Sequence, residues 1–284
     1  MGEGPPRLAI VRHTGCNDAA VGVGCPYNTG MPGGTSGTSG VAAKAVGRAA
    51  ELEQAPAVAL AALNEQITQC ERCPRLREHC AAIARERRRQ WREWEYWGRP
   101  VPSFGDPAAR VVVVGLAPGA HGSNRTGRPF TGDGSGDFLY PVLHETGFAS
   151  QPESTHREDG LVLTDMWITA AARCAPPGNK PTKDELRQCA PWLDVELRLL
   201  TEMRVVVCLG RIGFEAVVAA LVRSGALAAR SGIQFAHGAE YRLPDGQFLL
   251  ASYHPSLQNT NTGKLTRGMF CAIFERARQL AAHP

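Results

Sequence analysis

Short apolar runs alternate with amphipathic stretches along most of the chain. Runs rich in β-branched residues and bounded by Gly, Pro or polar residues predict strands that are buried on both faces of a sheet. Four runs fit this pattern, at residues 111–115, 161–172, 205–209 and 248–253. Helices are predicted where apolar positions share one side, at residues 138–147, 214–221 and 266–282. This alternation predicts an α/β fold with a parallel sheet covered by helices on both faces.

Three further segments complete the predicted organisation. Residues 225–247 predict a short hairpin, because Pro244-Asp-Gly is a turn signal. Residues 41–69 predict an amphipathic helix from the spacing of their apolar positions. The preceding residues are rich in Gly, Thr, Ser and Pro, so we expect a disordered or low-complexity tail over residues 1–45 and one folded domain over residues 46–284.

Composition narrows the class of protein. The chain has 284 residues, of which 43% are hydrophobic, and a net charge of +4, which permits binding to a polyanion without requiring it. No apolar run reaches the 18 or so residues of a membrane span, so we expect no membrane partner. Nine unevenly spaced cysteines do not suit a secreted disulfide scaffold. We therefore expect a cytoplasmic protein in a reducing setting.

A polar, glycine-rich loop follows the strand at residues 111–115. In open α/β sheets, ligands bind beyond the carboxyl ends of the strands, so this loop is the first candidate site. Its glycines allow the backbone to approach a ligand closely. Its side chains offer hydrogen bonds, charge, an aromatic face and a carboxylate: His121, Ser123, Asn124, Arg125, Arg128, Phe130 and Asp133.

A second polar loop, residues 254–264, follows the strand at residues 248–253. Because the carboxyl ends of parallel strands meet at one edge of a sheet, the two loops are expected to face each other. His254, held between a strand end and a proline, can donate to a negative charge that develops on a leaving group. Asp133 can orient water or stabilise a cationic sugar-like centre. A packed or capping histidine is the alternative interpretation.

Four cysteines form two spaced pairs. Cys70 and Cys73 lie on one turn, and Cys174 and Cys189 are separated by fourteen residues. Four thiolates without a nearby histidine favour an iron–sulfur cluster or a structural zinc ion. Cys80 is a spare candidate ligand, and four unrelated core cysteines are the alternative.

Residues 85–97 interleave arginines with Trp91, Trp94 and Trp97. Such a segment can follow a phosphate backbone or anchor a helix on the domain. A solvated face is an equally good interpretation, because three glutamates dilute the charge.

Taken together, these motifs resemble those of the uracil-DNA glycosylase superfamily, and most closely its iron–sulfur family 5, or type B. The resemblance covers about residues 63–281. It is carried by the cysteine spacing and by two motifs. The first is Gly115-Leu-Ala-Pro-Gly followed by Asn124-Arg-Thr-Gly-Arg-Pro-Phe-Thr-Gly-Asp, and the second is His254-Pro-Ser-Leu-Gln-Asn.

The resemblance implies a three-layer α/β/α fold with a central four-stranded parallel sheet. It implies a catalytic domain over residues 46–284 that removes uracil, and other deaminated bases, from DNA by hydrolysing the N-glycosidic bond. It also implies a [4Fe-4S] cluster held by Cys70, Cys73, Cys174 and Cys189. A monomer is the expected state of an enzyme that must wrap one duplex.

Individual roles follow from the same resemblance. Phe130 matches the aromatic residue that stacks on the flipped base, and His254 matches the residue that stabilises the departing base. Asp133 matches the acidic residue of the type B branch, and we assign the activation of water to it. Residues 255–259 match the segment pushed into the duplex. The predicted catalytic residues are Asp133, His254 and Asn124. The predicted substrate-binding residues are Gly115, Ala117, His121, Ser123, Phe130, Ser256, Gln258 and Asn259.

The chain also departs from the family pattern. A related iron–sulfur branch has an asparagine that reads the uracil edge before the third cysteine, where this chain has Thr169-Ala-Ala-Ala-Arg. A missing hydrogen bond no longer rejects mismatched bases, so we expect a broad substrate range that includes hypoxanthine or bulkier damaged pyrimidines. The alternatives are a non-catalytic nucleic-acid-binding protein with a structural metal site, or a zinc-dependent hydrolase of a small nucleotide.

Overall fold

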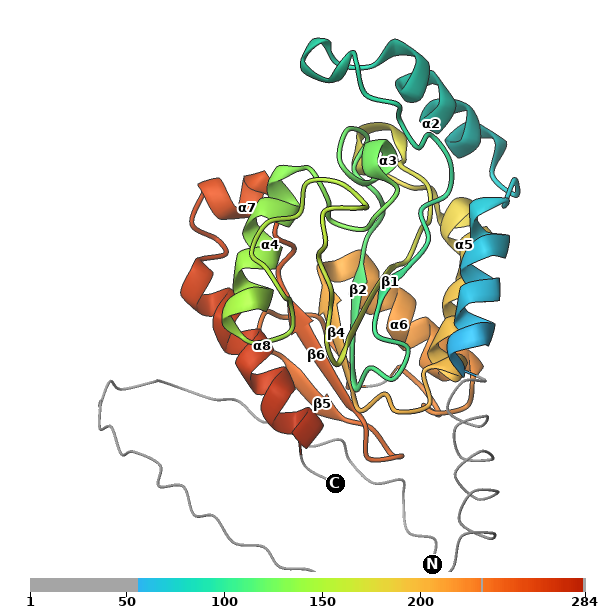
Figure 1. Ribbon diagram of the computed structural model, residues 1–284. Helices are drawn as coiled ribbons and strands as arrows, with labels where there is room; N and C mark the ends of the chain where they lie inside the picture. Colours follow the sequence, from blue (N-terminus) through green and yellow to red (C-terminus); the bar gives the residue numbers. More distant parts are fainter. Residues whose placement is uncertain (1–55, 231, 283–284) are drawn as a thin grey trace, which may run out of the picture.

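A computed structural model describes residues 56–230 and 232–282 of the chain (Figure 1). Its centre is a six-stranded sheet in the order β1-β3-β2-β4-β6-β5. The four inner strands are parallel, and the two edge strands are antiparallel to their neighbours. The strands are β1 (Phe104–Gly105), β2 (Val111–Gly115), β3 (Met166–Ala170), β4 (Val205–Leu209), β5 (Glu240–Arg242) and β6 (Phe248–Ser252).

The predicted fold class is confirmed, and the predicted strand number is corrected. The four predicted parallel strands are β2, β3, β4 and β6, but the sheet has six strands, not four. β5 is the first arm of the predicted hairpin and pairs with β6 across the Pro244 turn. β1 has only two residues, which is too short for any apolar period to be recognised.

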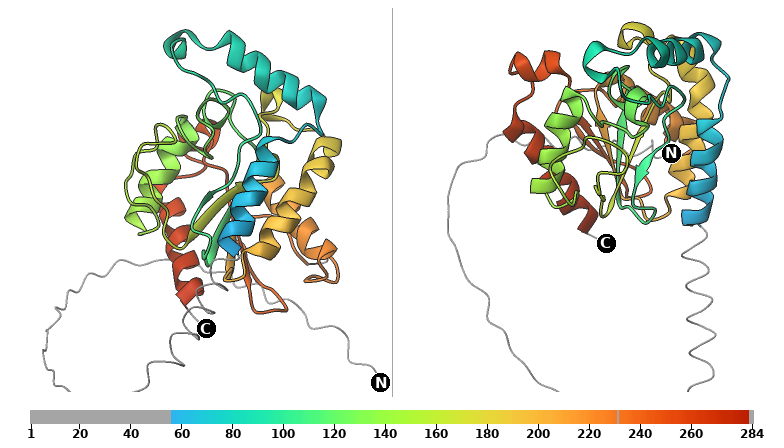
Figure 2. Two further views of the ribbon diagram at one scale, coloured as in Figure 1. Left: turned by 45° about the vertical axis from the view of Figure 1, so that its right-hand side comes forward. Right: turned by 45° about the horizontal axis from the view of Figure 1, so that its top comes forward.

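Alternating residues of the strands separate the two faces of the sheet. Val111 and Val113 of β2 belong to one core with Leu139 and Phe270, whereas Val112 belongs to the core on the opposite face. α4 (Gly134–Glu145) and α8 (Arg267–Ala282) cover the first face. The helical residues 56–68, α5 (Lys183–Leu199) and α6 (Arg211–Arg223) cover the second (Figure 2). The result is the expected α/β/α arrangement of three layers.

The remaining helical elements gather beyond the carboxyl ends of the parallel strands (Figure 1). They are α2 (Pro74–Glu86), the 3-10 turns η1 (Arg89–Trp91) and η2 (Pro177–Asn179), α3 (Ser123–Thr126) and α7 (Leu257–Asn261). Loops connect these elements, and binding residues lie mostly on loops that a rigid scaffold positions. This edge of the sheet carries most of the polar side chains predicted to form the site.

The predicted tail, residues 1–45, lies outside the described residues, and so does the predicted start of the first helix near residue 41. No helix in the described part of the chain combines the length and the apolar character that a bilayer crossing demands.

Candidate active site

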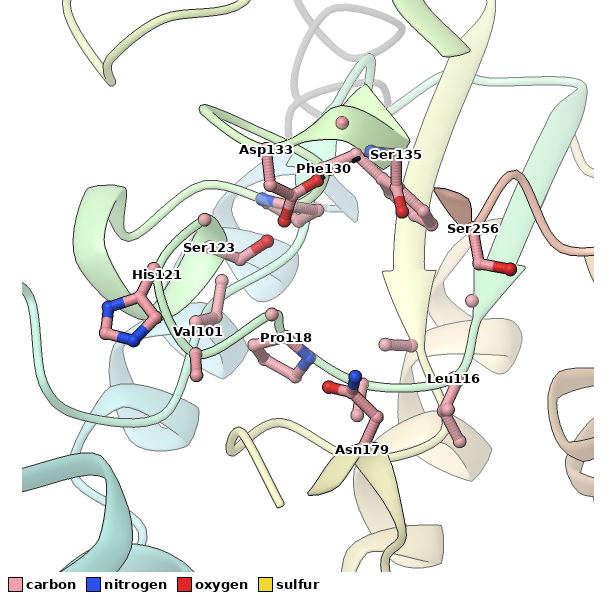
Figure 3. Close-up of a pocket in the computed structure, with 18 of the residues that line it drawn as sticks. Val101, Leu116, Pro118, His121, Ser123, Phe130, Asp133, Ser135, Asn179 and Ser256 are labelled. Carbon is pink, nitrogen blue, oxygen red and sulfur yellow. Dashed lines mark hydrogen bonds between the residues drawn. The ribbon is translucent and has the colours of Figure 1, made fainter. Parts of the chain in front are cut away.

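The two predicted loops meet around one cavity of about 660 Å³. It opens at the carboxyl ends of β2 and β6, as their parallel direction predicted. Side chains from both loops border the cavity, with His121 and Ser256 at its opposite sides in Figure 3. Nine predicted site residues line it: Gly115, Ala117, His121, Ser123, Phe130, Asp133, His254, Ser256 and Gln258.

Asp133 is the N-cap of α4. Its carboxylate accepts hydrogen bonds from the backbone nitrogens of Ser135 at 3.0 Å and Gly136 at 3.2 Å. Its second oxygen lies against Gly119 and Gly122, where an added Cβ would stand only 2.6 and 1.9 Å from it. Burial raises the pKa of Asp133, although the two backbone hydrogen bonds partly oppose this. Both glycines are therefore required for the carboxylate to reach the cavity wall.

Phe130 forms the aromatic floor of the cavity. Its backbone has a φ of 51°, which is uncommon for a residue with a side chain. A Cβ on Gly115 would stand 2.9 Å from the end of its ring, so the strand end must be glycine for the ring to lie there. The ring centroids of Phe130 and His254 are 5.8 Å apart with an interplanar angle of 33°. The imidazole and the aromatic ring are therefore neighbours in the lining of the cavity.

His254 is a neutral imidazole at pH 7, because burial lowers its pKa to about 4. The side chain of Asn259 donates a hydrogen bond of 2.8 Å to the backbone oxygen of His254. This contact fixes the loop on which the imidazole stands. A neutral imidazole donates through one ring nitrogen, so His254 can stabilise a developing anion without being charged.

Two predicted site residues, Asn124 and Asn259, do not line the cavity. Asn124 is fully buried, and its amide nitrogen lies within hydrogen-bond distance of the backbone oxygens of Cys80, at 3.3 Å, and Ala120, at 3.4 Å. It links α2 to the loop after β2, so the structure gives no support to its predicted catalytic role. Asn259 supports the backbone of His254 and does not line the cavity.

Comparison with known proteins gives concordant matches. The family model described as "Uracil DNA glycosylase superfamily" matches residues 102–278. The chain is 60% identical over 186 residues to a type-5 uracil-DNA glycosylase of Thermus thermophilus, which is 66% of this chain and 82% of that protein. It is 46% identical over 229 residues to a type-5 uracil-DNA glycosylase of Mycobacterium leprae, which is 79% of this chain and 97% of that protein.

The chain belongs to the uracil-DNA glycosylase superfamily. The predicted resemblance to this superfamily, and to its family 5, is thereby confirmed. A type-4 uracil-DNA glycosylase of Sulfurisphaera tokodaii is more distant, with 28% identity over 190 residues, or 65% of this chain and 76% of that protein.

Asn179 and Leu257 are among the residues at the cavity of this glycosylase-superfamily member that were not named individually from the sequence. Asn179, at the end of η2, lines the cavity and has a φ of 57°. Its signal was the Pro-Pro-Gly-Asn turn that follows Cys174, which places a polar side chain after a tight turn. Leu257 lies within the predicted duplex-contacting segment, lines the cavity mouth and is 57% exposed.

The four predicted cysteine ligands line a second, much smaller pocket. Cys70, Cys73, Cys174 and Cys189 all border it, although residues 73 and 174 are far apart in the sequence. The pKa of Cys189 is raised to about 11, mainly by burial and in part by the nearby thiols of Cys70 and Cys73. In the described residues, no group of three or more His, Cys, Asp or Glu side chains has the spacing of a preformed metal site.

Arg173 lies between the two pockets and borders both. Its guanidinium donates to Glu196 at 2.5 Å and to the hydroxyl of Ser103 at 2.5 Å. Glu196 is fully buried and also accepts from Trp167 at 3.0 Å and Thr169 at 2.6 Å. This network fixes the wall that separates the base cavity from the cysteine pocket.

A second buried ion pair holds the loop that carries Phe130. Arg128 and Asp159 meet through two hydrogen bonds of 2.7 and 2.6 Å, with side-chain exposures of 4% and 6%. Burial disfavours the charged Asp159, but hydrogen bonds from Arg128 and from the backbone outweigh it and lower its pKa. The segment around residues 151–161 is thereby fixed to the cavity loop.

The burial of His254 predicts a specific pH dependence of stability. An unfolded histidine has a pKa of about 6.5, and that of folded His254 is about 4. Between these values the unfolded chain binds more protons, so His254 contributes about 3 kcal/mol less stability below pH 4 than above pH 6.5. Urea unfolding at both ends of this range should show a smaller loss on acidification for His254→Asn than for the wild type. Equal losses would contradict the burial of this imidazole.

Proposed function

We propose that this protein hydrolyses the N-glycosidic bond of uracil in DNA. The observation that supports this most directly is the convergence of Phe130, Asp133 and His254 on one cavity in a member of this superfamily. A base inside a duplex hides its sugar carbon, so the nucleotide must be flipped out. The cavity accepts the flipped base with the Phe130 ring available for stacking.

The proposed reaction is a displacement by water at C1′ of the deoxyribose. The bond between C1′ and N1 of uracil breaks, and its electron pair moves onto the base. A hydrogen bond from neutral His254 stabilises the resulting negative charge. Asp133 orients the water and accepts its proton, because its raised pKa makes it a better base than an exposed carboxylate. The products are the free base and an abasic sugar.

Several neighbouring groups complete the proposed substrate site. Leu257 is the exposed apolar side chain of the segment predicted to enter the duplex, and it fits a wedge that occupies the space of the flipped base. Ser123 and Ser256 line opposite parts of the cavity and offer hydroxyl groups to phosphate oxygens. The predicted cytoplasmic location and monomeric state stay predictions.

The cysteine pocket supports a [4Fe-4S] cluster as a structural cofactor. The residues fit such a group, because four thiols from two distant segments line one pocket and Arg173 lies beside them. Cys70, Cys73, Cys174 and Cys189 would hold the cluster. When bound it would cross-link the segment before the sheet to α5, and the hydrolysis needs no redox change.

Replacing Asp133 by Asn tests the proposed reaction. Asn also caps helices well, so α4 should stay folded. We expect Asp133→Asn to lower the single-turnover rate on a uracil-containing duplex by roughly 10²- to 10⁴-fold while binding is retained. The wild-type rate should fall as the pH falls through the raised pKa of Asp133, and the variant should lack this acid limb. Asp137→Asn, in the first turn of the same helix, is the matched control. Unchanged cleavage by Asp133→Asn would refute the role proposed for Asp133, whereas binding without cleavage by the wild type would favour the non-catalytic alternative.

The cofactor proposal has a spectroscopic test. Protein purified without oxygen should be brown, with broad visible absorption and about four irons per chain. Cys73→Ser should lose the colour and iron, whereas Cys271→Ser, which lies outside the cysteine pocket, should keep both. A colourless wild-type protein with stoichiometric zinc would exclude the cluster and support a structural zinc site.

The predicted breadth of substrate is tested with a panel of duplexes. Ala170 and Ala172 line the cavity in place of the edge-reading amide, so excision of hypoxanthine or bulkier damaged pyrimidines is expected beside uracil. Asn179 presents an amide from another segment, and Asn179→Ala separates its contribution from that of the small wall. Wild-type activity confined to uracil would contradict the broad range.

A further inference from the structure

Residues 85–97 form a projecting segment that we call the arginine arch. It runs from the last two residues of α2 through η1 and returns toward β1, overhanging α3 at the top of Figure 1. We propose that this arch binds the phosphate backbone of the DNA strand next to the base cavity. The proposal rests on the proposed function, which supplies DNA as the partner, and adds a surface for it outside the catalytic loops.

The aromatic side chains of the arch face the protein. Trp91 and Trp94 stack on Arg125, with ring centroids 4.3 and 4.1 Å from its guanidinium carbon. Arg125 is 3% exposed and donates to the backbone oxygens of His121 and Gly132, each at 2.8 Å. Trp91 also stacks on His121 at 6.1 Å. Trp91 and Trp94 therefore anchor the arch on the cavity loop, as one interpretation of the sequence predicted.

The arginines of the arch face outward. Arg87 closes the arch by donating to the backbone oxygens of Arg92 at 2.8 Å and Ala84 at 3.2 Å. The five arginines are exposed: Arg85, Arg87, Arg88, Arg89 and Arg92.

These arginines keep their charge unneutralised by the protein. Eight ion pairs are found among the described residues, and each contains an arginine from elsewhere in the chain. None contains an arch arginine, although Glu86, Glu93 and Glu95 belong to the same segment. Five arginines and three glutamates leave this segment with a net charge of +2. The arch therefore carries a net positive charge, and within the described residues no carboxylate forms an ion pair with its arginines.

The arch borders the cavity on the side away from the duplex-contacting loop. Arg88 and Trp91 line the cavity, and Trp91 stacks on His121, whereas Leu257 lines it next to Ser256 in the chain. His121 and Ser256 lie on opposite sides of the cavity (Figure 3). A strand that delivers one nucleotide into the cavity therefore leaves on one side past Leu257 and on the other past the arch. Guanidinium groups match phosphate oxygens in geometry and charge, and such contacts are independent of base sequence.

The test uses the full-length protein and compares two double variants. Arg89→Gln/Arg92→Gln removes two outward charges but leaves Arg87, which closes the arch, and Arg88, which lines the cavity. Arg198→Gln/Arg242→Gln removes two exposed arginines at the opposite end of the sheet. Dissociation constants are measured against salt concentration for an undamaged duplex and for one that carries an uncleavable uracil nucleotide. Single-turnover cleavage is measured at saturating enzyme.

We expect Arg89→Gln/Arg92→Gln to raise the Kd for both duplexes roughly tenfold and to reduce the slope of log K against log salt by about two. Its saturated cleavage rate should equal that of the wild type, and the control should match the wild type throughout. An unchanged Kd and salt slope, or a slower saturated rate with unchanged binding, would overturn the proposal. If the wild type failed to excise uracil while the arch variant still weakened binding to the undamaged duplex, the arch assignment would stand and the proposed function would fail.

Discussion

The site depends on the close approach of backbone to two side chains. The carboxylate of Asp133 lies against Gly119 and Gly122, and the ring of Phe130 lies against Gly115, at distances that no Cβ permits. These contacts fold the loop after β2 back on itself, so that its last residues stand over the strand from which it departs. The helix that begins at Asp133 then fixes the carboxylate by two backbone hydrogen bonds. Without these glycines, the acid and the aromatic floor would not lie at one cavity.

Buried ion pairs hold this arrangement from two sides. Arg128 and Asp159 fix the loop after β2 to the segment before β3, and Arg173 and Glu196 fix the segment after β3 to α5. Charges taken out of water are costly unless they are paired and hydrogen-bonded, so each pair strongly disfavours any alternative position of its loop. The base cavity is thus formed by loops whose positions are specified by electrostatics as well as by packing.

Much of this architecture could be predicted from the sequence, because its strongest signals are local or depend on strand direction. The four apolar runs predicted the inner strands, and their parallel direction correctly placed Asp133 and His254 at one edge of the sheet. β1 was missed because two residues carry no period, and its pairing is decided by β3. Asn124 illustrates a different limit. A polar residue in a candidate loop can point inward, and only the position of α2 shows that its amide serves the backbone of Cys80.

Arg125 connects the cavity loop to the arginine arch. It belongs to the loop that carries Phe130 and Asp133, and its guanidinium stacks on the rings of Trp91 and Trp94 in the arch. The pocket for a base and the surface beside it are therefore joined through one guanidinium. A substitution at this position would remove contacts from the loop and from the arch at the same time.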